Sequence, residues 1–255
     1  NILSEAVKIA AKERPQYQVT ILSGFFWHYM EQIDDEPVVT KEFERPCPML
    51  IDSKTFGKLH YRVTYFNKRI NLDFFHAIAD GNGAIEFLNL IVYHYLKLKH
   101  SDEIPNLTMT SGASEADLSE DSFRHYYSKN KKSIKKKKEK NAYQIKGAKL
   151  PYNQIQLMEV HMNVKDVRKK AKENNVSLTS YIASKLMMCI YKDMPVIKRI
   201  QPVTISMPVN LRNYYPSYTS RNFFNSVNVS HVFKNTDTFE SVATQFQADL
   251  KNELT

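Results

Sequence analysis

Residues 70–83 read Ile-Asn-Leu-Asp-Phe-Phe-His-Ala-Ile-Ala-Asp-Gly-Asn-Gly, and they combine a strand pattern with turn signals. Apolar side chains alternate with others from Ile70 to Phe74, which is typical of a β-strand. His76 has the parity of the apolar positions, so a continued strand would point it inward, toward the core or a cleft. Residues 80–83 favour a turn and a helix cap, and residues 84–98 carry apolar side chains at helical spacing.

Two readings of this stretch need no catalysis. An inward histidine is commonly a hydrogen-bonded core residue. A histidine and an aspartate four residues apart, His76 and Asp80, could also hold a metal. No third ligand lies nearby in a helical register, however, and protein metal sites usually use three or four ligands. We therefore predict no metal site.

The composition is that of a folded chain. Of its 255 residues 42% are hydrophobic, which is enough for a substantial core. The two cysteines, Cys47 and Cys189, are too few for a disulfide framework, which favours a reducing compartment and a cytoplasmic location. No apolar run reaches the length of about 18 residues that a transmembrane helix needs, so we expect no membrane span. The single tryptophan, Trp27, is expected in the core.

The net charge of +9 is partly concentrated in a lysine-rich run over residues 129–140. Such a run is usually a solvated loop or helix face. A basic nucleic-acid-binding module is one alternative, but no nucleic-acid motif accompanies the lysines, so we expect no nucleic-acid partner. An acidic acyl carrier protein or the phosphates of coenzyme A would be a better match for the charge.

The remaining patterns alternate between helices and strands. We predict helices over residues 2–13, 163–173, 177–192 and 236–254, and a partly helical segment over 123–141. We predict strands over residues 17–22, 25–31, 38–43, 59–66, 69–75, 155–161, 201–207 and 224–233. The polar stretch 101–121 reads as a connector. The order predicts two mixed α/β lobes.

Two motifs give this order a precedent. Residues 75–81, Phe-His-Ala-Ile-Ala-Asp-Gly, resemble the His-x-x-x-Asp-Gly motif of a large acyltransferase superfamily. It includes chloramphenicol acetyltransferase, the condensation domains of peptide synthetases, plant acyltransferases and alcohol acetyltransferases. Residues 205–212, Ile-Ser-Met-Pro-Val-Asn-Leu-Arg, and 220–225, Ser-Arg-Asn-Phe-Phe-Asn, are similar to the alcohol acetyltransferase and condensation-like branch. The motifs come in the family's order and at about its spacing.

The resemblance implies a fold and a domain arrangement. Members have the chloramphenicol acetyltransferase-like fold, in which two α/β (α+β) two-layer sandwich lobes flank a channel. Members usually begin with a strand before the first helix and run beyond the end of this chain. We therefore expect a fragment: an N-terminal lobe over residues 1–100, a polar and lysine-rich connector over 101–153, and a partial C-terminal lobe over 154–255.

The resemblance also implies a reaction. Members move an acyl group from a coenzyme A or acyl-carrier thioester to an alcohol or amine, with no permanently bound cofactor. His76 would be the general base, because an imidazole pKa of about 6.5 suits proton transfer near neutral pH. Asp80 would pair with Arg212 and hold the turn, and Gly81 would allow close approach of backbone and substrate. Ser206 and Asn210 are weaker candidates for oxyanion or substrate contacts, since a role at a strand end or turn would explain them equally well.

One departure from the motif narrows the subtype. Phe75 stands where condensation domains often have a first histidine, which weakens the peptide-synthetase subtype more than the acyltransferase reading. A non-catalytic relative that binds a carrier protein or a small molecule in the same cleft is the alternative function. Partners expected from the lead reading are a small-molecule acyl acceptor and an acyl carrier protein.

Overall fold

The structure is a computed structural model that describes residues 1–42, 57–101, 113–128, 140–151 and 155–254. The chain forms two compact units. Unit 1 comprises residues 1–128, 150–157 and 211–223, and unit 2 comprises residues 129–149, 158–210 and 224–255. Neither unit is contiguous in sequence, in contrast to the linear boundaries expected above. The segment 211–223 belongs to unit 1 because its polar groups bond there, as the site below shows.

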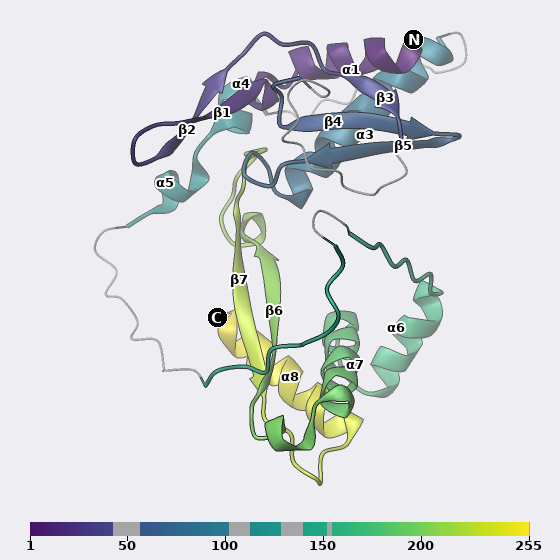
Figure 1. The fold of residues 1–255 in the computed structure, drawn as a ribbon, viewed down its shortest axis with the longest axis vertical. Helices are drawn as coiled ribbons and strands as arrows, with labels where there is room; N and C mark the ends of the chain where they lie inside the picture. Colours follow the sequence, from purple (N-terminus) through teal and green to yellow (C-terminus); the bar gives the residue numbers. More distant parts are fainter. Residues whose placement is uncertain (43–56, 102–112, 129–139, 152–154, 255) are drawn as a thin grey trace. The chain divides into compact units, whose positions relative to one another are not determined.

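A three-stranded sheet forms the centre of unit 1. Its order is β3 (Val39–Lys41), β4 (Tyr61–Phe66) and β5 (Arg69–Phe74), with β3 parallel and β5 antiparallel to β4. The predicted hairpin is present, and Asn67 takes the positive φ of 52° that its two-residue turn requires. Helices α1 (Ile2–Lys12) and α3 (Gly81–Lys99) share a core with this sheet (Figure 1). Rings from four elements meet in this core: Tyr17, Tyr61, Phe74 and Phe87.

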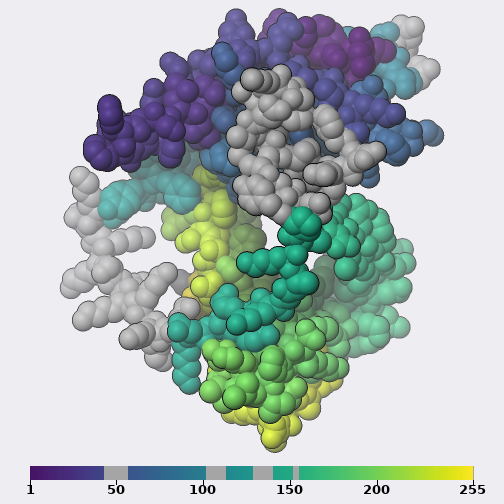
Figure 2. All heavy atoms as spheres, viewed as in Figure 1, coloured from purple at the N-terminus to yellow at the C-terminus, as the bar shows by residue number. Residues whose placement is uncertain are grey.

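A second hairpin of unit 1 differs from the prediction at its tip. Strands β1 (Val19–Ser23) and β2 (His28–Gln32) pair antiparallel, and the Gly24 N–H donates to the Trp27 carbonyl across the turn. The expected core position of Trp27 is wrong: 63% of this residue is exposed, as are 96% of Phe25 and 93% of Phe26. The reason is that Trp27 lies in the turn and not in the strand. The hairpin is the dark purple projection on the left of unit 1 in Figures 1 and 2.

Unit 2 is built on a two-stranded antiparallel ladder. Strands β6 (Val203–Asn210) and β7 (Phe224–His231) pair from Val203 opposite His231 to Asn210 opposite Phe224. Helices α7 (Leu178–Asp193) and α8 (Phe239–Glu253) pack on this ladder (Figure 1), and α6 (Val164–Glu173) precedes α7. The core combines Met187 of α7, Val203 and Val229 of the ladder, and Phe246 of α8. All three helices start at side-chain caps, namely Asn163, Ser177 and Thr238.

Short helices and one unpaired segment complete the description. Unit 1 also contains η1 (Pro15–Tyr17), α4 (Glu115–Ser119), α5 (Ser122–Tyr126) and η3 (Leu211–Asn213), and unit 2 contains η2 (Val196–Lys198). The strand predicted over residues 155–161 is wrong: these side chains are exposed and the segment forms no ladder with any described residue. Alternation alone cannot make a strand without a partner for its backbone. Most of the lysine-rich run, and Cys47, lie outside the described residues.

Candidate functional site

The structure places His76 on a tight turn at the end of β5. The strand stops at Phe74, and the Phe75 N–H still donates to the His60 carbonyl at 2.9 Å. The Ile78 N–H then closes the turn by donating to the Phe75 carbonyl at 3.0 Å. The His76 side chain is exposed. The strand does not continue to this residue, so the direction expected of a continued strand, toward the core or a cleft, does not apply. The alternation rule fails here because the strand ends two residues too early.

The backbone of this turn is held from a distant part of the sequence. The Asn222 side-chain amide donates from Nδ2 to the His76 carbonyl at 2.8 Å and to the Ala77 carbonyl at 3.1 Å. Asn222 belongs to the second motif, yet the sequence analysis gave it no role. A single amide thus connects the two motifs and fixes the two peptide groups on either side of Ala77.

Asp80 ends the turn and starts helix α3. It is the N-cap residue, and its Oδ1 accepts a hydrogen bond of 3.0 Å from the Gly83 N–H. Its Oδ2 accepts from Arg212 Nη1 at 2.7 Å and from the Phe223 N–H at 2.9 Å. Only 7% of the Asp80 side chain and 10% of the Arg212 side chain are exposed. The ion pair implied by the family resemblance is therefore present, and it is buried.

Arg212 also organises the loop from which it comes. Its Nε and Nη2 donate to the Thr219 carbonyl at 3.1 and 2.7 Å, and Nη2 donates to the Arg221 carbonyl at 2.7 Å. The guanidinium group thus bridges its own loop and Asp80. This arrangement satisfies donors that would be costly to bury unpaired.

The pKa of Asp80 follows from these contacts. Burial alone would raise the pKa of the carboxyl group, because it disfavours the charged form. The hydrogen bonds from Arg212, Phe223 and Gly83, together with the charge of the guanidinium group, outweigh burial and hold the pKa below its ordinary value of 3.8. Asp80 is consequently ionised at neutral pH, with both oxygens engaged. It is a structural partner and not a second acid.

Close backbone approach occurs at Gly83 and not at Gly81. A Cβ built on Gly83 would lie 2.1 Å from the Ser220 carbonyl oxygen and 2.8 Å from the Tyr17 hydroxyl oxygen. That hydroxyl donates to the same carbonyl at 3.0 Å. A Cβ on Gly81 would meet nothing described within 4 Å, so the close approach expected there is not needed by the protein. A role of Gly81 toward substrate stays a prediction.

The other two candidates lie in unit 2. Ser206 is an exposed residue in the middle of β6, where it pairs with Asn228, and Asn210 ends that strand. Asn210 agrees with the strand-end role considered above, whereas Ser206 lies within the ladder and neither at a strand end nor in a turn. Their proposed oxyanion or substrate contacts stay predictions, as does the catalytic role of His76.

Neither metal ligands nor a bilayer-spanning helix is found in the described part of the chain. Among these residues no three His, Cys, Asp or Glu side chains gather as a metal site would require. None of the described helices is sufficiently long and apolar to cross a bilayer. Cys189 is a free, exposed thiol in unit 2.

Comparison of the sequence with family models gives no match, and comparison with curated proteins gives none either. Solved structures, by contrast, match along 99% of the chain. Polyketide synthase associated protein 5 from Mycobacterium tuberculosis matches with a TM-score of 0.61 at 14% identity, and the chain covers 65% of it. The starter condensation domain of rhizomide synthetase, solved with C8-CoA, matches with a TM-score of 0.57 at 11% identity and 62% coverage. The X-domain in a complex with OxyB from teicoplanin biosynthesis matches with a TM-score of 0.53 at 9% identity and 62% coverage.

These matches establish the fold. The chain has the mixed α/β fold of the chloramphenicol acetyltransferase and condensation-domain type, as the sequence predicted, and it spans about two thirds of the length of the matching chains. Identities of 9 to 14% carry the fold alone.

Proposed function

We propose that this chain is the His76-bearing part of an acyltransferase that moves an acyl group from a thioester to an alcohol or amine. The observation that carries the proposal is the exposed His76 side chain on a turn whose backbone is fixed by Asn222 and by the Asp80–Arg212 pair. A rigid turn that presents an imidazole is the arrangement that general-base catalysis needs.

The proposed reaction needs one proton acceptor and no covalent intermediate on the protein. His76 takes the proton from the hydroxyl or amine as that group attacks the thioester carbonyl. The new C–O or C–N bond forms, the C–S bond breaks, and the imidazolium returns the proton to the departing thiolate. Asp80 takes no part in proton transfer, because both of its oxygens accept bonds within the protein.

The donor in this proposal is an acyl-CoA or an acyl group on a carrier protein. One structure of the same fold was solved with C8-CoA, which supports an acyl-CoA as the first donor to test. The acceptor in this proposal is a small alcohol or amine.

The proposal is tested by thiol release from octanoyl-CoA in the presence of a panel of alcohols and amines. Replacing His76 by Ala should lower turnover by about 100- to 10,000-fold, the usual contribution of a positioned base. His161→Ala is the matched control, because 91% of that histidine side chain is exposed and the residue belongs to unit 2 and to neither motif. Turnover by His76→Ala equal to that of the unmodified chain would remove His76 from the mechanism.

A second candidate is a non-catalytic domain that binds a partner protein. The observation that favours it is the match to an X-domain solved as a complex with OxyB. Two results would favour this candidate. The unmodified chain would show no thioester turnover, and both the unmodified chain and the His76→Ala variant would capture an acyl carrier protein.

A further inference from the structure

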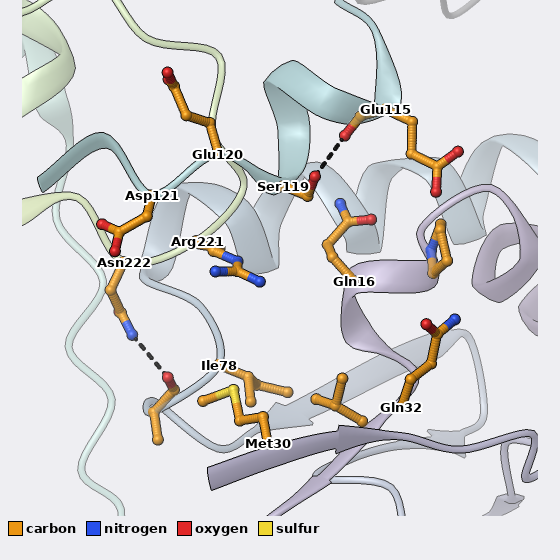
Figure 3. A pocket seen from close by; sticks show the side chains of 13 residues that line it. Gln16, Met30, Gln32, Ile78, Glu115, Ser119, Glu120, Asp121, Arg221 and Asn222 are labelled. Atoms are coloured by element: carbon orange, nitrogen blue, oxygen red, sulfur yellow. Dashed lines mark hydrogen bonds between the residues drawn. The ribbon is translucent and has the colours of Figure 1, made fainter. Parts of the chain in front are cut away.

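Unit 1 contains a pocket of about 500 Å³ beside the His76 turn, which contributes Ala77 and Ile78 to its lining. It lies between η1, the β1–β2 hairpin, α4 and the segment that carries Arg221 (Figure 3). Its apolar lining includes Met30 and Ile78, and its polar lining includes Gln16, Arg221 and three carboxylates. This volume suits a small molecule.

The strongest sign of a ligand is Gln16. Both polar atoms of its side chain, Nε2 and Oε1, are buried, and neither has a hydrogen-bond partner among the described residues. The Oδ1 atom of Asn222 is buried and unpartnered in the same way, although its Nδ2 is used at the His76 turn. Buried polar groups are usually satisfied, so a donor and two acceptors left open at one pocket need an explanation. A ligand that accepts from and donates to an amide would supply it.

The charges at the pocket define that ligand further. The guanidinium group of Arg221 points into the pocket in Figure 3 and has no ion-pair partner in the described part of the chain. Glu120 is already engaged, because its carboxylate accepts from Ser122 and pairs with His125. Asp121 uses one oxygen to cap α5, and the Glu115 side chain makes no bond with a described residue. One cation and two available carboxylates therefore remain.

We propose that this pocket binds a small zwitterion of amino-acid to dipeptide size. Its carboxylate would bind Arg221, whose planar fork suits bidentate contact with a carboxylate. Its ammonium group would bind Asp121 or Glu115. An amide in the ligand would pair with the Gln16 side chain, accepting from Nε2 and donating to Oε1. The proposal concerns binding alone and does not depend on His76 acting as a base.

The experiment screens free amino acids and dipeptides against the full chain by saturation-transfer NMR, and it measures the affinity of each ligand found by calorimetry. We expect at least one dipeptide to bind. Acetylation of its amino group or amidation of its carboxylate should each weaken binding at least tenfold. A screen without any binder, or equal binding of the blocked forms, would overturn the proposal.

Variants test the assignment of residues. Arg221→Gln should weaken binding at least tenfold without unfolding the chain, because Arg221 is exposed and its backbone contacts are kept. Asp121→Asn removes a charge but keeps a good helix cap, and it should also weaken binding if the ammonium group lies there, with Glu115→Gln as the counterpart. Unchanged affinity in Arg221→Gln would refute the carboxylate site, and unchanged affinity in both of the other variants would refute the ammonium site.

Gln16 offers the sharpest comparison. Gln16→Leu should raise the melting temperature of the free protein, because it removes two unpartnered buried atoms, and it should abolish binding. Gln18→Leu is the matched control: the Gln18 amide donates to the Asp35 carbonyl and accepts from the Tyr61 hydroxyl, so this variant should lower the melting temperature and keep binding. A lower melting temperature with unchanged binding in Gln16→Leu would show that the Gln16 amide serves the fold and not a ligand.

Discussion

Replacing Asp80 by Ala should remove a large share of the stability of unit 1. The change leaves the Arg212 guanidinium group buried without its carboxylate, and breaking a buried ion pair typically costs about 3–5 kcal/mol. It also removes the N-cap of α3, which is worth about 1 kcal/mol, and leaves the Phe223 N–H without its acceptor. The free energy of unfolding should therefore fall by about 4–6 kcal/mol, compared with a total of about 5–15 kcal/mol for a typical domain.

The assay is hydrogen exchange of α3 and of residues 211–223, read by mass spectrometry. It reports on unit 1 directly, whereas a single melting curve for two units would mix their transitions. Asp80→Asn separates the two losses, because asparagine caps a helix about as well as aspartate but carries no charge. It should recover about 1 kcal/mol of the loss and no more.

Glu42→Ala is the control that tests whether burial of the Asp80–Arg212 ion pair matters. Glu42 also pairs with an arginine, Arg69, but 27% and 55% of these side chains are exposed. An exposed pair of this kind contributes about 0–1 kcal/mol. Equal exchange rates in Asp80→Ala and Glu42→Ala would refute the reasoning, because they would mean that burial gives the Asp80–Arg212 pair no special weight.

Three further outcomes are expected. Gly83→Ala should destabilise unit 1, because its Cβ would lie 2.1 Å from the Ser220 carbonyl oxygen. Gly81→Ala meets open space at the start of α3 and should stabilise unit 1 by about 0.4–1 kcal/mol. Chemical denaturation compares the two variants. Acid should weaken unit 1, because folding lowers the pKa of Asp80. The contribution of Asp80 to the free energy of unfolding is complete above the ordinary carboxyl pKa of 3.8 and is lost as the pH falls through the lower folded value. Asp80→Asn should flatten this part of the pH–stability curve. Trp27→Gln should change the free energy of unfolding by less than about 0.5 kcal/mol, because the ring is exposed, and denaturant titration measures it; a loss as large as that of a core aromatic would contradict its position in the turn.

Much of the fold could be predicted because local signals and burial agree. Helix α3 begins directly after its N-cap Asp80, as the capping chemistry predicts, and the hairpin through Asn67 follows from alternation and a two-residue turn. Trp27 was misplaced because composition favours burial of tryptophan and does not detect a turn. Residues 155–161 alternate correctly, but pairing is a tertiary property that a single segment does not contain.

Only some residues of the candidate site could be predicted from the sequence. The Asp80–Arg212 pair was expected only through a resemblance, since 132 residues separate its members and no spacing rule connects them. Asn222 and Gly83 were both within the quoted motifs, but neither had a distinctive signal: an asparagine in a loop usually caps a turn, and a glycine near a helix start usually serves backbone freedom. Their roles depend on where Ser220 and the His76 carbonyl lie, which only the folded loop determines.

Because of the way in which the His76 turn is held, a catalytic role of the His76 side chain can be separated from a structural one. Five hydrogen bonds that hold the turn involve its backbone or Asp80. They run from the Phe75 N–H to the His60 carbonyl, from the Ile78 N–H to the Phe75 carbonyl, from the Asn222 amide to the His76 and Ala77 carbonyls, and from Arg212 to Asp80. None of these bonds uses the imidazole, so shortening the side chain at position 76 leaves each of them in place. We therefore expect His76→Ala to keep the exchange protection of α3 that Asp80→Ala loses. If His76→Ala instead exposed α3 to the same degree, the ring would belong to the fold, and a loss of turnover in that variant would say nothing about a base.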